Sequence, residues 1–338
     1  MDDPTLNKKK LKPAPNILGV LAGKGGVGKS TITAELALAL NKEGYKVGVL
    51  DADIYGPSIR HLLPEDALPQ AVGDKVLPAD SKGVSVISSA YFPKGRGPTG
   101  VRAPIANQII AQFIEEVEWG SLDVLLVDFP PGTGDVQITL MQRLFFNGAI
   151  VVTTPEKLSL LDVRKSMDMC LQMGVPLLGV LENMSYFPNP ESETRHYLFG
   201  KEGGKALAEE FSVPLIGEIP IDQGLNQQNM ERTSTPLFDK LGKTVVHQMS
   251  EEKGCKIKRV DRYHFSIEWL DGKKSLYQFS TVQGKCPCIE CSMKNETCAV
   301  DVEGIEIHPI GNYGVQISFS KGCSKGIYPF SYLRRLDR

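Results

Sequence analysis

Long apolar runs are missing from this chain of 338 residues, and none approaches the roughly 20 residues that a membrane-spanning helix needs. Neither sign of charge dominates, because 38 Lys and Arg residues face 40 Asp and Glu residues. The resulting net charge of −2 gives no indication of a nucleic-acid-binding surface. The first 15 residues lack the apolar stretch of a secretory signal, and we expect residues 1–15 to form a flexible tail. The sequence therefore predicts a cytoplasmic protein that binds neither nucleic acid nor membrane.

A disulfide framework is not expected either, because the seven cysteines occur in a chain without a secretory signal. Four of them lie between positions 286 and 298, and such clustering indicates a metal or redox site. The contents of hydrophobic residues (41%) and charged residues (23%) are typical of a globular protein. The length leaves room for two domains or for one large one.

A glycine-rich stretch between a strand pattern and a helix pattern is the most informative part of the sequence. The apolar residues 17–21 indicate a buried strand, and residues 32–40 have helical periodicity. The stretch between them matches the phosphate-binding pattern G-x-x-x-x-G-K-[ST] and consists of Gly23, Lys24, Gly25, Gly26, Val27, Gly28, Lys29, Ser30 and Thr31. Glycines let backbone N–H groups approach phosphates, and the helix N-terminus adds partial positive charge. We expect Lys29 to reach the β- and γ-phosphates of ATP and Ser30 to hold Mg²⁺.

Two further apolar runs end in carboxylates that suit a magnesium nucleotide. One run leads into Asp51 and Asp53, and the other leads into Asp128. We expect Asp51 and Asp128 to act on Mg²⁺ through its water ligands, and Asp53 to position the attacking water. The turn after Asp128 contains Gly132, in a loop whose backbone N–H groups are placed to sense the γ-phosphate. Taken singly, Asp51 or Asp53 is also consistent with a capping residue in a loop, and any buried strand can end in an aspartate such as Asp128.

Lys24 gives the loop a second lysine, and this feature resembles the phosphate loop of the MinD, ParA and nitrogenase-iron-protein class. The resemblance implies a homodimer in which Lys24 reaches the nucleotide of the other subunit and acts in catalysis with Lys29 and Asp53. A cation that arrives in this way stabilises phosphate charge only when the dimer has closed. The alternative for Lys24 is an ordinary solvated surface lysine.

The order of apolar runs and helical patterns predicts the fold of residues 16–250. Continuous Val, Ile and Leu runs alternate with helical segments, which indicates a parallel sheet covered on both faces. We expect an α/β fold with a doubly wound, mostly parallel sheet of the MinD/ParA-like P-loop type and ligands at the carboxyl ends of its strands. Residues 254–338 have short alternating strand patterns, which predict a smaller β-rich, metal-binding domain.

Four motifs, in this order, resemble the Mrp/ApbC family of dimeric P-loop ATPases that carry or help insert iron–sulfur clusters. They occupy residues 23–30, 51–58, 128–135 and 182–187. The resemblance implies an ATP-hydrolysing iron–sulfur cluster carrier whose partners are client apo-proteins and an assembly scaffold. It also implies that Asn183 hydrogen-bonds the adenine of ATP, and that Pro220 and Asp222 flank the same base.

One departure from that family concerns the cluster. Members that hold a cluster at the dimer interface usually have a Cys-x-x-Cys shortly after the Asn-Met-Ser of the last motif, but residues 187–196 contain no cysteine. Since thiolates are the usual cluster ligands, the departure argues against an interface cluster at this place. We expect His196 to be solvated and Cys170 to be buried in the core.

The C-terminal part contains an internal echo. Residues 265–269 are mirrored by residues 315–319, and each segment is followed by a Gly turn, an apolar-Tyr pair and an aromatic residue. The alternation within each segment predicts a half-buried strand. A module of this size is expected to need a stabilising group in addition to its core.

A metal is the expected stabilising group. Cys286, Cys288 and Cys291 give three thiolates within six residues, and Cys323 falls in the turn of the second half of the echo. Zn²⁺ takes four tetrahedral ligands, so Cys323 would complete the set, with Cys298 as the alternative fourth ligand. By ligand type, the four cysteines suit Zn²⁺ or an iron–sulfur cluster, which would be [4Fe–4S]. The remaining alternative is four reduced thiols without a metal.

This cysteine arrangement resembles the N-terminal domain of γ-butyrobetaine hydroxylase-like proteins. In that domain a Cys-x-Cys-x-x-Cys and a distant His bind zinc, and Cys323 stands where the His would be. The same domain is fused to the ATPase in the plastid high-chlorophyll-fluorescence-type members of the Mrp family, which also lack the interface Cys-x-x-Cys. The resemblance implies that the present chain is closest to those members.

Three functions remain open from the sequence. The favoured one is an ATPase that loads or transfers iron–sulfur clusters to apo-proteins. The second is a MinD- or ParA-like positioning ATPase, in which dimerisation drives association with a membrane or with DNA. The third is a nucleotide-switched scaffold with structural zinc and no cluster.

Overall fold

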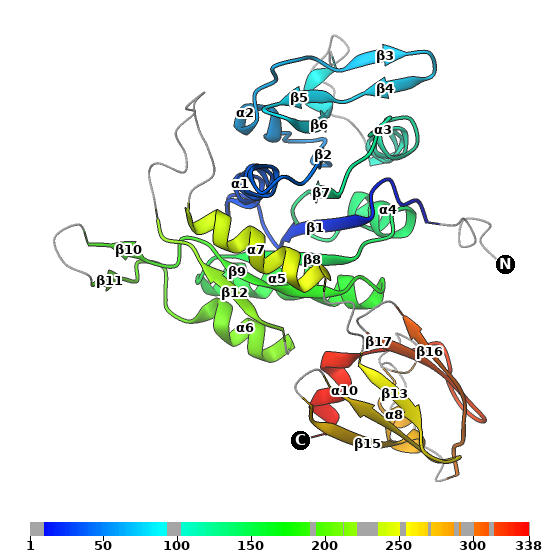
Figure 1. The fold of residues 1–338 in the computed structure, drawn as a ribbon. Helices are drawn as coiled ribbons and strands as arrows, with labels where there is room; N and C mark the ends of the chain where they lie inside the picture. Colours follow the sequence, from blue (N-terminus) through cyan, green and yellow to red (C-terminus); the bar gives the residue numbers. More distant parts are fainter. Residues whose placement is uncertain are drawn as a thin grey trace. The chain divides into compact units, whose positions relative to one another are not determined.

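The computed structural model describes residues 10–92, 103–189, 194–211, 213–221, 236–250, 255–269, 272–286, 291, 301–310 and 314–337. The chain forms two compact units (Figure 1). The first comprises Met1–Glu209 and Pro214–Met249, and the second comprises Glu210–Val213 and Ser250–Arg338. Among the described residues, no helix has both the length and the apolar character needed to cross a membrane.

The first unit is built on a sheet of eight strands with the order β12-β9-β8-β1-β7-β2-β6-β5. The strands are β1 (Asn16–Ala22), β2 (Val47–Asp51), β5 (Ala79–Ser81), β6 (Val84–Ser88), β7 (Val124–Asp128), β8 (Gly148–Thr153), β9 (Leu177–Glu182) and β12 (Leu215–Glu218). All neighbours pair in parallel except β5, which runs antiparallel to β6. The doubly wound, mostly parallel sheet expected from the sequence is therefore confirmed.

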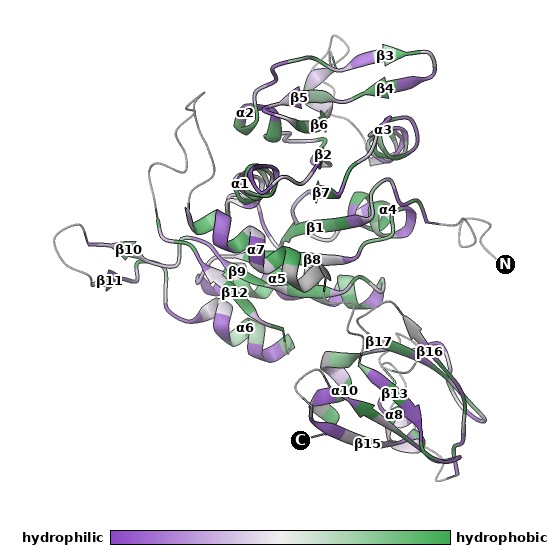
Figure 2. Cartoon of the chain, in the orientation of Figure 1, coloured by the Kyte–Doolittle hydropathy of each residue, from purple (hydrophilic) through white to green (hydrophobic). Residues whose placement is uncertain are grey.

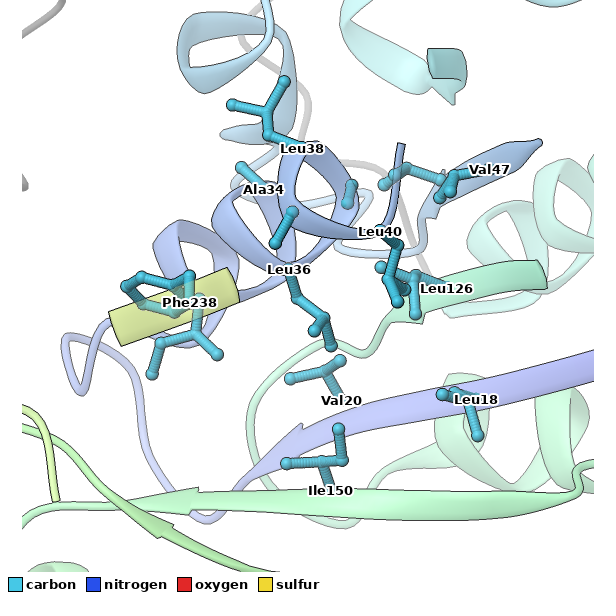
Figure 3. Close-up of a cluster of buried hydrophobic side chains, with 14 of the residues drawn as sticks. Leu18, Val20, Ala34, Leu36, Leu38, Leu40, Val47, Leu126, Ile150 and Phe238 are labelled. Atoms are coloured by element: carbon cyan, nitrogen blue, oxygen red, sulfur yellow. The ribbon is translucent and has the colours of Figure 1, made fainter. Parts of the chain in front are cut away.

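Helices cover both faces of this sheet, which explains why its central strands are apolar throughout. The helices are α1 (Lys29–Lys42), α2 (Ile59–Leu62), α3 (Ala103–Glu115), α4 (Asp135–Arg143), α5 (Lys157–Gln172), α6 (Gly203–Phe211) and α7 (Pro236–Ser250). One buried cluster joins α1 and α7 to the sheet, and a second joins α3, α4 and α5 to it. Figure 2 shows the central strands in the green of hydrophobic residues. In Figure 3, Leu36 of α1 points toward Val20 of β1, and Phe238 of α7 lies beside α1.

Two small hairpins complete the description of the first unit. One pairs β3 (Gln70–Val72) with β4 (Lys75–Leu77), and the other pairs β10 (Phe187–Pro188) with β11 (Arg195–His196). Short, exposed strands carry little hydrophobic periodicity, so the sequence patterns did not indicate these hairpins. His196 is exposed and Cys170 is fully buried, as expected.

The sheet has a topological switch point at β1. This strand lies between β7 and β8. The strands β7, β2, β6 and β5 follow on one side of it, and β8, β9 and β12 follow on the other. In open α/β sheets, ligands bind at such a point, beyond the carboxyl ends of the strands. The loop that follows β1 is the glycine-rich stretch, so the topology places it where a ligand is expected.

The second unit consists of two halves with the same order of elements. The first half contains β13 (Lys256–Arg259), β14 (His264–Glu268), β15 (Lys274–Gln278) and α8 (Phe279–Gly284). The second half contains β16 (Gly304–Ile310), β17 (Gly314–Phe319), β18 (Ile327–Pro329) and α10 (Phe330–Leu336). Each half is an antiparallel three-stranded sheet followed by a helix, and one hydrophobic cluster joins both halves. The internal echo in the sequence thus corresponds to a structural repeat.

Candidate functional site

The glycine-rich loop leaves its backbone open to a ligand. Gly25 and Gly26 are exposed, and a Cβ added at either would meet no heavy atom within 4 Å. Gly28 has a φ of 86° and directly precedes Lys29, where α1 begins. A Cβ at Gly28 would lie 2.3 Å from the side-chain amide nitrogen of Asn183, so only glycine suits this position. Backbone N–H groups at a helix N-terminus, without side chains in the way, suit phosphate binding.

Lys29 and Asp128 form a buried ion pair below the loop. The distance between Lys29 Nζ and Asp128 Oδ1 is 2.6 Å, and the two side chains are 7% and 0% exposed. The Ser30 hydroxyl donates to Asp128 Oδ2 at 2.7 Å, and the Thr33 hydroxyl donates to Asp128 Oδ1 at 2.9 Å. The side chains expected to hold phosphate and Mg²⁺ are therefore brought together, and Asp128 is fully supplied with donors.

Asp51 and Asp128 are direct register partners on the neighbouring strands β2 and β7. Asp51 is buried and accepts hydrogen bonds from the Ser88 hydroxyl at 2.9 Å and from the backbone N–H of Asp53 at 3.2 Å. Burial, and then the charge of Asp128, raise the pKa of Asp51 to about 7. Two adjacent buried carboxylates disfavour each other's ionisation, and a divalent cation would relieve this repulsion. The pair fits Mg²⁺, which is usually held by one or two carboxylates together with phosphates and water.

Asp53 and Gly132 lie in the loops that follow β2 and β7. Asp53 Oδ1 accepts a hydrogen bond from the backbone N–H of Gly56 at 3.0 Å, so its carboxylate also shapes its own turn. Gly132 has a φ of 86°, and its N–H donates to the Ala22 carbonyl at the end of β1. Both loops therefore start at the same edge of the sheet as the glycine-rich loop.

Lys24 makes an ion pair within its own chain. Its Nζ lies 2.5 Å from Glu156 Oε2, at the residue that precedes α5. The neighbouring Gly23 packs against the same helix, because a Cβ there would lie 2.2 Å from the backbone nitrogen of Val163. The start of the loop therefore packs against α5 at Gly23, and the ion pair of Lys24 with Glu156 holds it near the N-terminus of that helix.

Asn183 follows β9 and faces the glycine-rich loop. Its side-chain amide donates to the Val27 carbonyl at 2.8 Å, and the residue is 8% exposed. Pro220 is half-buried after β12, where the backbone N–H of Ile219 donates to the Glu182 carbonyl. Asn183 and Pro220 thus follow the neighbouring strands β9 and β12, whereas Asp222 lies outside the described residues.

Three of the expected metal ligands converge in the second unit. The sulfur atoms of Cys286, Cys291 and Cys323 all lie within 4.8 Å of one another. The Sγ atoms of Cys286 and Cys323 are 3.8 Å apart. Cys288 and the alternative ligand Cys298 lie outside the described residues. A tetrahedral ion with bonds of about 2.3 Å to sulfur places its thiolates about 3.8 Å apart, so the spacing fits a single soft ion.

Several residues around these sites were not singled out from the sequence. Thr33 lies one helical turn after Lys29, so the i,i+4 spacing on α1 is a signal that could have indicated it. Ser88 ends β6, so its position at a strand end was a weaker signal. Glu156 is 132 positions from Lys24, and nothing local in the sequence connects the two.

Comparisons with known proteins agree with this geometry. Residues 14–252 match the ParA family model, described as NUBPL iron-transfer P-loop NTPase, and residues 256–334 match the model of the γ-butyrobetaine hydroxylase-like N-terminal domain. The chain is 43% identical over 227 residues to an iron–sulfur cluster carrier protein of Synechocystis sp., covering 65% of this chain and 64% of the relative. It is 41% identical to an iron–sulfur cluster carrier protein of Methanococcus maripaludis, covering 70% of this chain and 86% of the relative.

A solved structure is also similar. It is a nucleotide-binding protein from Archaeoglobus fulgidus in complex with ADP, with 38% identity and a TM-score of 0.56. The similarity covers 69% of this chain and 88% of that protein. The family match extends over the whole sheet and both ends of the glycine-rich loop, from before β1 to the end of α7. The chain therefore belongs to the family of NUBPL iron-transfer P-loop NTPases.

Proposed function

We propose that this protein is an ATPase that carries iron–sulfur clusters and transfers them to apo-proteins. The observation that carries the proposal is the convergence of Lys29, Ser30, Asp51 and Asp128 below an open glycine-rich loop. The names of the relatives indicate the cargo. A cytoplasmic location and the absence of nucleic-acid and membrane partners remain predictions from the sequence.

In the proposed mechanism, ATP phosphates take the place of Asp128 as the partner of Lys29. The backbone N–H groups of Gly25 to Ser30 surround the phosphates, and Asp51 and the freed Asp128 would hold Mg²⁺ through its water ligands. When bound, Mg²⁺ would neutralise charge on the phosphate oxygens. Asp53 positions the attacking water, and Asn183 and Pro220, with Asp222, hold the adenine.

We further propose that catalysis requires a homodimer, because Lys24 lies at the mouth of the loop and not beneath it. In this scheme Lys24 leaves Glu156 and reaches the nucleotide of a second copy. A cation that arrives only in the closed dimer links hydrolysis to assembly, and so to the binding and release of cargo.

The cysteine site of the second unit is proposed to bind metal through Cys286, Cys291 and Cys323, with Cys288 as the fourth ligand. The 3.8 Å spacing of two sulfur atoms supports one soft ion, because thiolates that bind different irons of a cluster lie farther apart. Of the two candidates, zinc and a [4Fe–4S] cluster, the spacing thus favours zinc. The combination of both modules supports the plastid high-chlorophyll-fluorescence-type subgroup.

Anaerobic reconstitution tests the function. The purified chain is incubated with iron and sulfide, and cluster transfer to an apo-ferredoxin is followed by absorbance with and without ATP. We expect transfer by the wild type, no ATP-dependent transfer by Lys29→Ala, and wild-type transfer by Lys243→Ala. Lys243 is an exposed lysine on α7 that pairs with Glu43 and serves as the matched control. Failure of the wild type to take up any cluster would contradict the proposal.

Metal analysis of anaerobically purified protein separates the alternatives. Iron and sulfide support the carrier, whereas stoichiometric zinc without cluster uptake supports the nucleotide-switched scaffold. A positioning ATPase would instead show nucleotide-dependent binding to vesicles or DNA and no cluster.

A further inference from the structure

The two halves of the second unit make reciprocal contacts through equivalent residues. Phe265 and Val315 occupy the same position in β14 and β17, 50 positions apart, and each is the register partner of a tyrosine, Tyr277 or Tyr328. After the turn the offset is 51 positions, so Phe279 and Phe330 correspond as the first residues of α8 and α10. This correspondence allows every contact between the halves to be compared with its counterpart.

The aromatic contacts follow the correspondence closely. Trp269 of the first half meets Phe330 of the second, with ring centroids 6.2 Å apart and an interplanar angle of 87°. Phe319 of the second half meets Phe279 of the first, at 6.3 Å and 79°. Trp269 corresponds to Phe319 and Phe330 to Phe279, so one edge-to-face contact occurs twice. The halves are therefore related by an approximate two-fold arrangement.

The contacts between helix ends and turns are also equivalent, but their chemistry differs. Asp337, directly after α10, contacts Lys273 in the turn after β14, with 2.6 Å between Oδ2 and Nζ. Cys286, after α8, contacts Cys323 in the turn after β17, with 3.8 Å between the sulfur atoms. By the same offsets, Cys286 corresponds to Asp337 and Cys323 corresponds to Lys273. The contact between the end of α10 and the first-half turn is thus an ion pair, whereas the equivalent contact between the end of α8 and the second-half turn is made by two thiols.

The ion-pair contact needs no metal. Asp337 Oδ2 also accepts a hydrogen bond from the Ser275 hydroxyl at 2.6 Å, and Ser275 in turn accepts one from the Trp269 indole. Lys273, and then Ser275, hold the pKa of Asp337 below its ordinary value, so the carboxylate is charged at neutral pH. Lys273 is half exposed and Asp337 is 18% exposed, so solvent weakens the ion pair, and the hydrogen bond from the less accessible Ser275 adds to the contact.

The strength of the contact between Cys286 and Cys323, by comparison, depends on whether a metal ion is bound. Two neutral thiols 3.8 Å apart are weak donors and acceptors, whereas thiolates are held together by a soft cation. The Tyr328 hydroxyl is fully buried, and no nitrogen or oxygen partner is present for it among the described residues. It lies close to the thiol of Cys286. A phenol O–H at this place can donate a hydrogen bond to a thiolate.

We infer that the second unit has two equivalent contacts between its halves, one metal-dependent and one ionic, and that the ionic contact, together with the shared hydrophobic cluster, keeps the unit folded when the cysteine site is empty. This inference rests on the proposed metal binding at the cysteine site. It has a functional consequence, because a site whose loss of metal does not unfold the domain can be filled and emptied repeatedly. Such a site suits metal that is delivered, whereas a purely structural zinc site unfolds on removal of the ion.

Amide hydrogen exchange on the full-length, reduced protein tests the inference. Metal content is measured before and after treatment with a chelator, and exchange is followed for peptides from β14 and β17. We expect the wild type to keep protection in both strands after metal removal. In Asp337→Asn and Lys273→Gln, protection should persist with metal and fall by about tenfold or more without it.

Glu268→Gln is the matched control, because Glu268 pairs with Lys274 within the first half alone, at 3.8 Å. This variant should behave as the wild type does. Loss of protection in the metal-free wild type would overturn the inference, as would full protection in both metal-free Asp337 and Lys273 variants. If both variants are unfolded even with metal, the metal-dependent contact cannot replace the ionic one, and the inference is wrong. A chain that binds no metal at all would instead overturn the proposed metal site itself.

Discussion

Lys24 and Glu156 form an ion pair at the mouth of the phosphate-binding loop, with 2.5 Å between Nζ and Oε2. The two side chains are 33% and 47% exposed, so solvent screens the pair and its net contribution to stability is small. The contact therefore restrains Lys24 without preventing its release. In the proposed dimer, Glu156 would compete for Lys24 with the phosphate of the second copy.

The first prediction separates the roles of these two residues. Lys24→Ala should bind ATP but fail to dimerise with a non-hydrolysable analogue, and its ATPase rate should fall by about 10²-fold or more, as expected for loss of a charge that contacts the transition state. Glu156→Gln should dimerise at least as readily as the wild type, because Lys24 is no longer held in its own chain. Light scattering and phosphate release measure both effects, with Lys165→Ala, an exposed lysine of α5, as the control. Unchanged dimerisation of Lys24→Ala would contradict the proposed role of Lys24.

The second prediction concerns the buried pair of Lys29 and Asp128. Lys29→Met leaves a buried carboxylate without its cation, and should lower the free energy of unfolding of the nucleotide-free protein by about 3 kcal/mol. The double variant Lys29→Met with Asp128→Asn should recover most of this stability but bind no ATP. Denaturant unfolding and nucleotide titration distinguish the two effects. Equal stability of the single and double variants would show that the pair does not carry this energy.

Much of the first unit follows from local patterns. The apolar runs predict the central strands because strands buried on both faces need no alternation, and the acids at Asp51 and Asp128 mark where two of these runs stop. That these two acids are register partners follows only from the pairing of β2 with β7, which are separated by 72 residues of chain between Asp51 and Val124. Pairing over such distances depends on tertiary packing and leaves no local trace.

The second unit shows a different limit. The echo between residues 265–269 and 315–319 predicts two similar strands, and β14 and β17 are present at these positions. The helices α8 and α10 were not expected, because each is too short to develop a helical period. The contact between Cys286 and Cys323 requires α8 to end opposite the turn after β17 in the other half. The clustering of cysteines in the sequence indicated the metal ligands, whereas the close approach of Cys286 to Cys323 is explained only by the structural repeat.

The third prediction concerns the dependence of stability on pH. The pKa of Asp51 is raised to about 7 from an ordinary value of 3.8, so between these values the folded state binds a proton that the unfolded state does not. The free energy of unfolding of the nucleotide-free protein should therefore fall as pH rises from 5 through 7. In Asp51→Asn this contribution is absent, and the difference between the two proteins should change in that window. Unfolding curves at pH 5, 6, 7 and 8 without Mg²⁺ measure it, and a constant difference would contradict the assignment.

The fourth prediction uses thiol reactivity to locate the metal. Cys170 is fully buried in the first unit, and burial raises its pKa to about 12, so it should resist alkylation until the protein unfolds. Cys286, Cys291 and Cys323 converge in the second unit, and bound metal should slow their alkylation by about tenfold or more relative to the metal-free protein. Peptide mass spectrometry after brief treatment with iodoacetamide reads each cysteine separately. Cys323→Ser should lose the protection at Cys286 and Cys291 together, because the remaining thiols no longer complete the ligand set, while Cys170→Ser should leave it intact. Independent behaviour of the three cysteines would show that they do not share one ion.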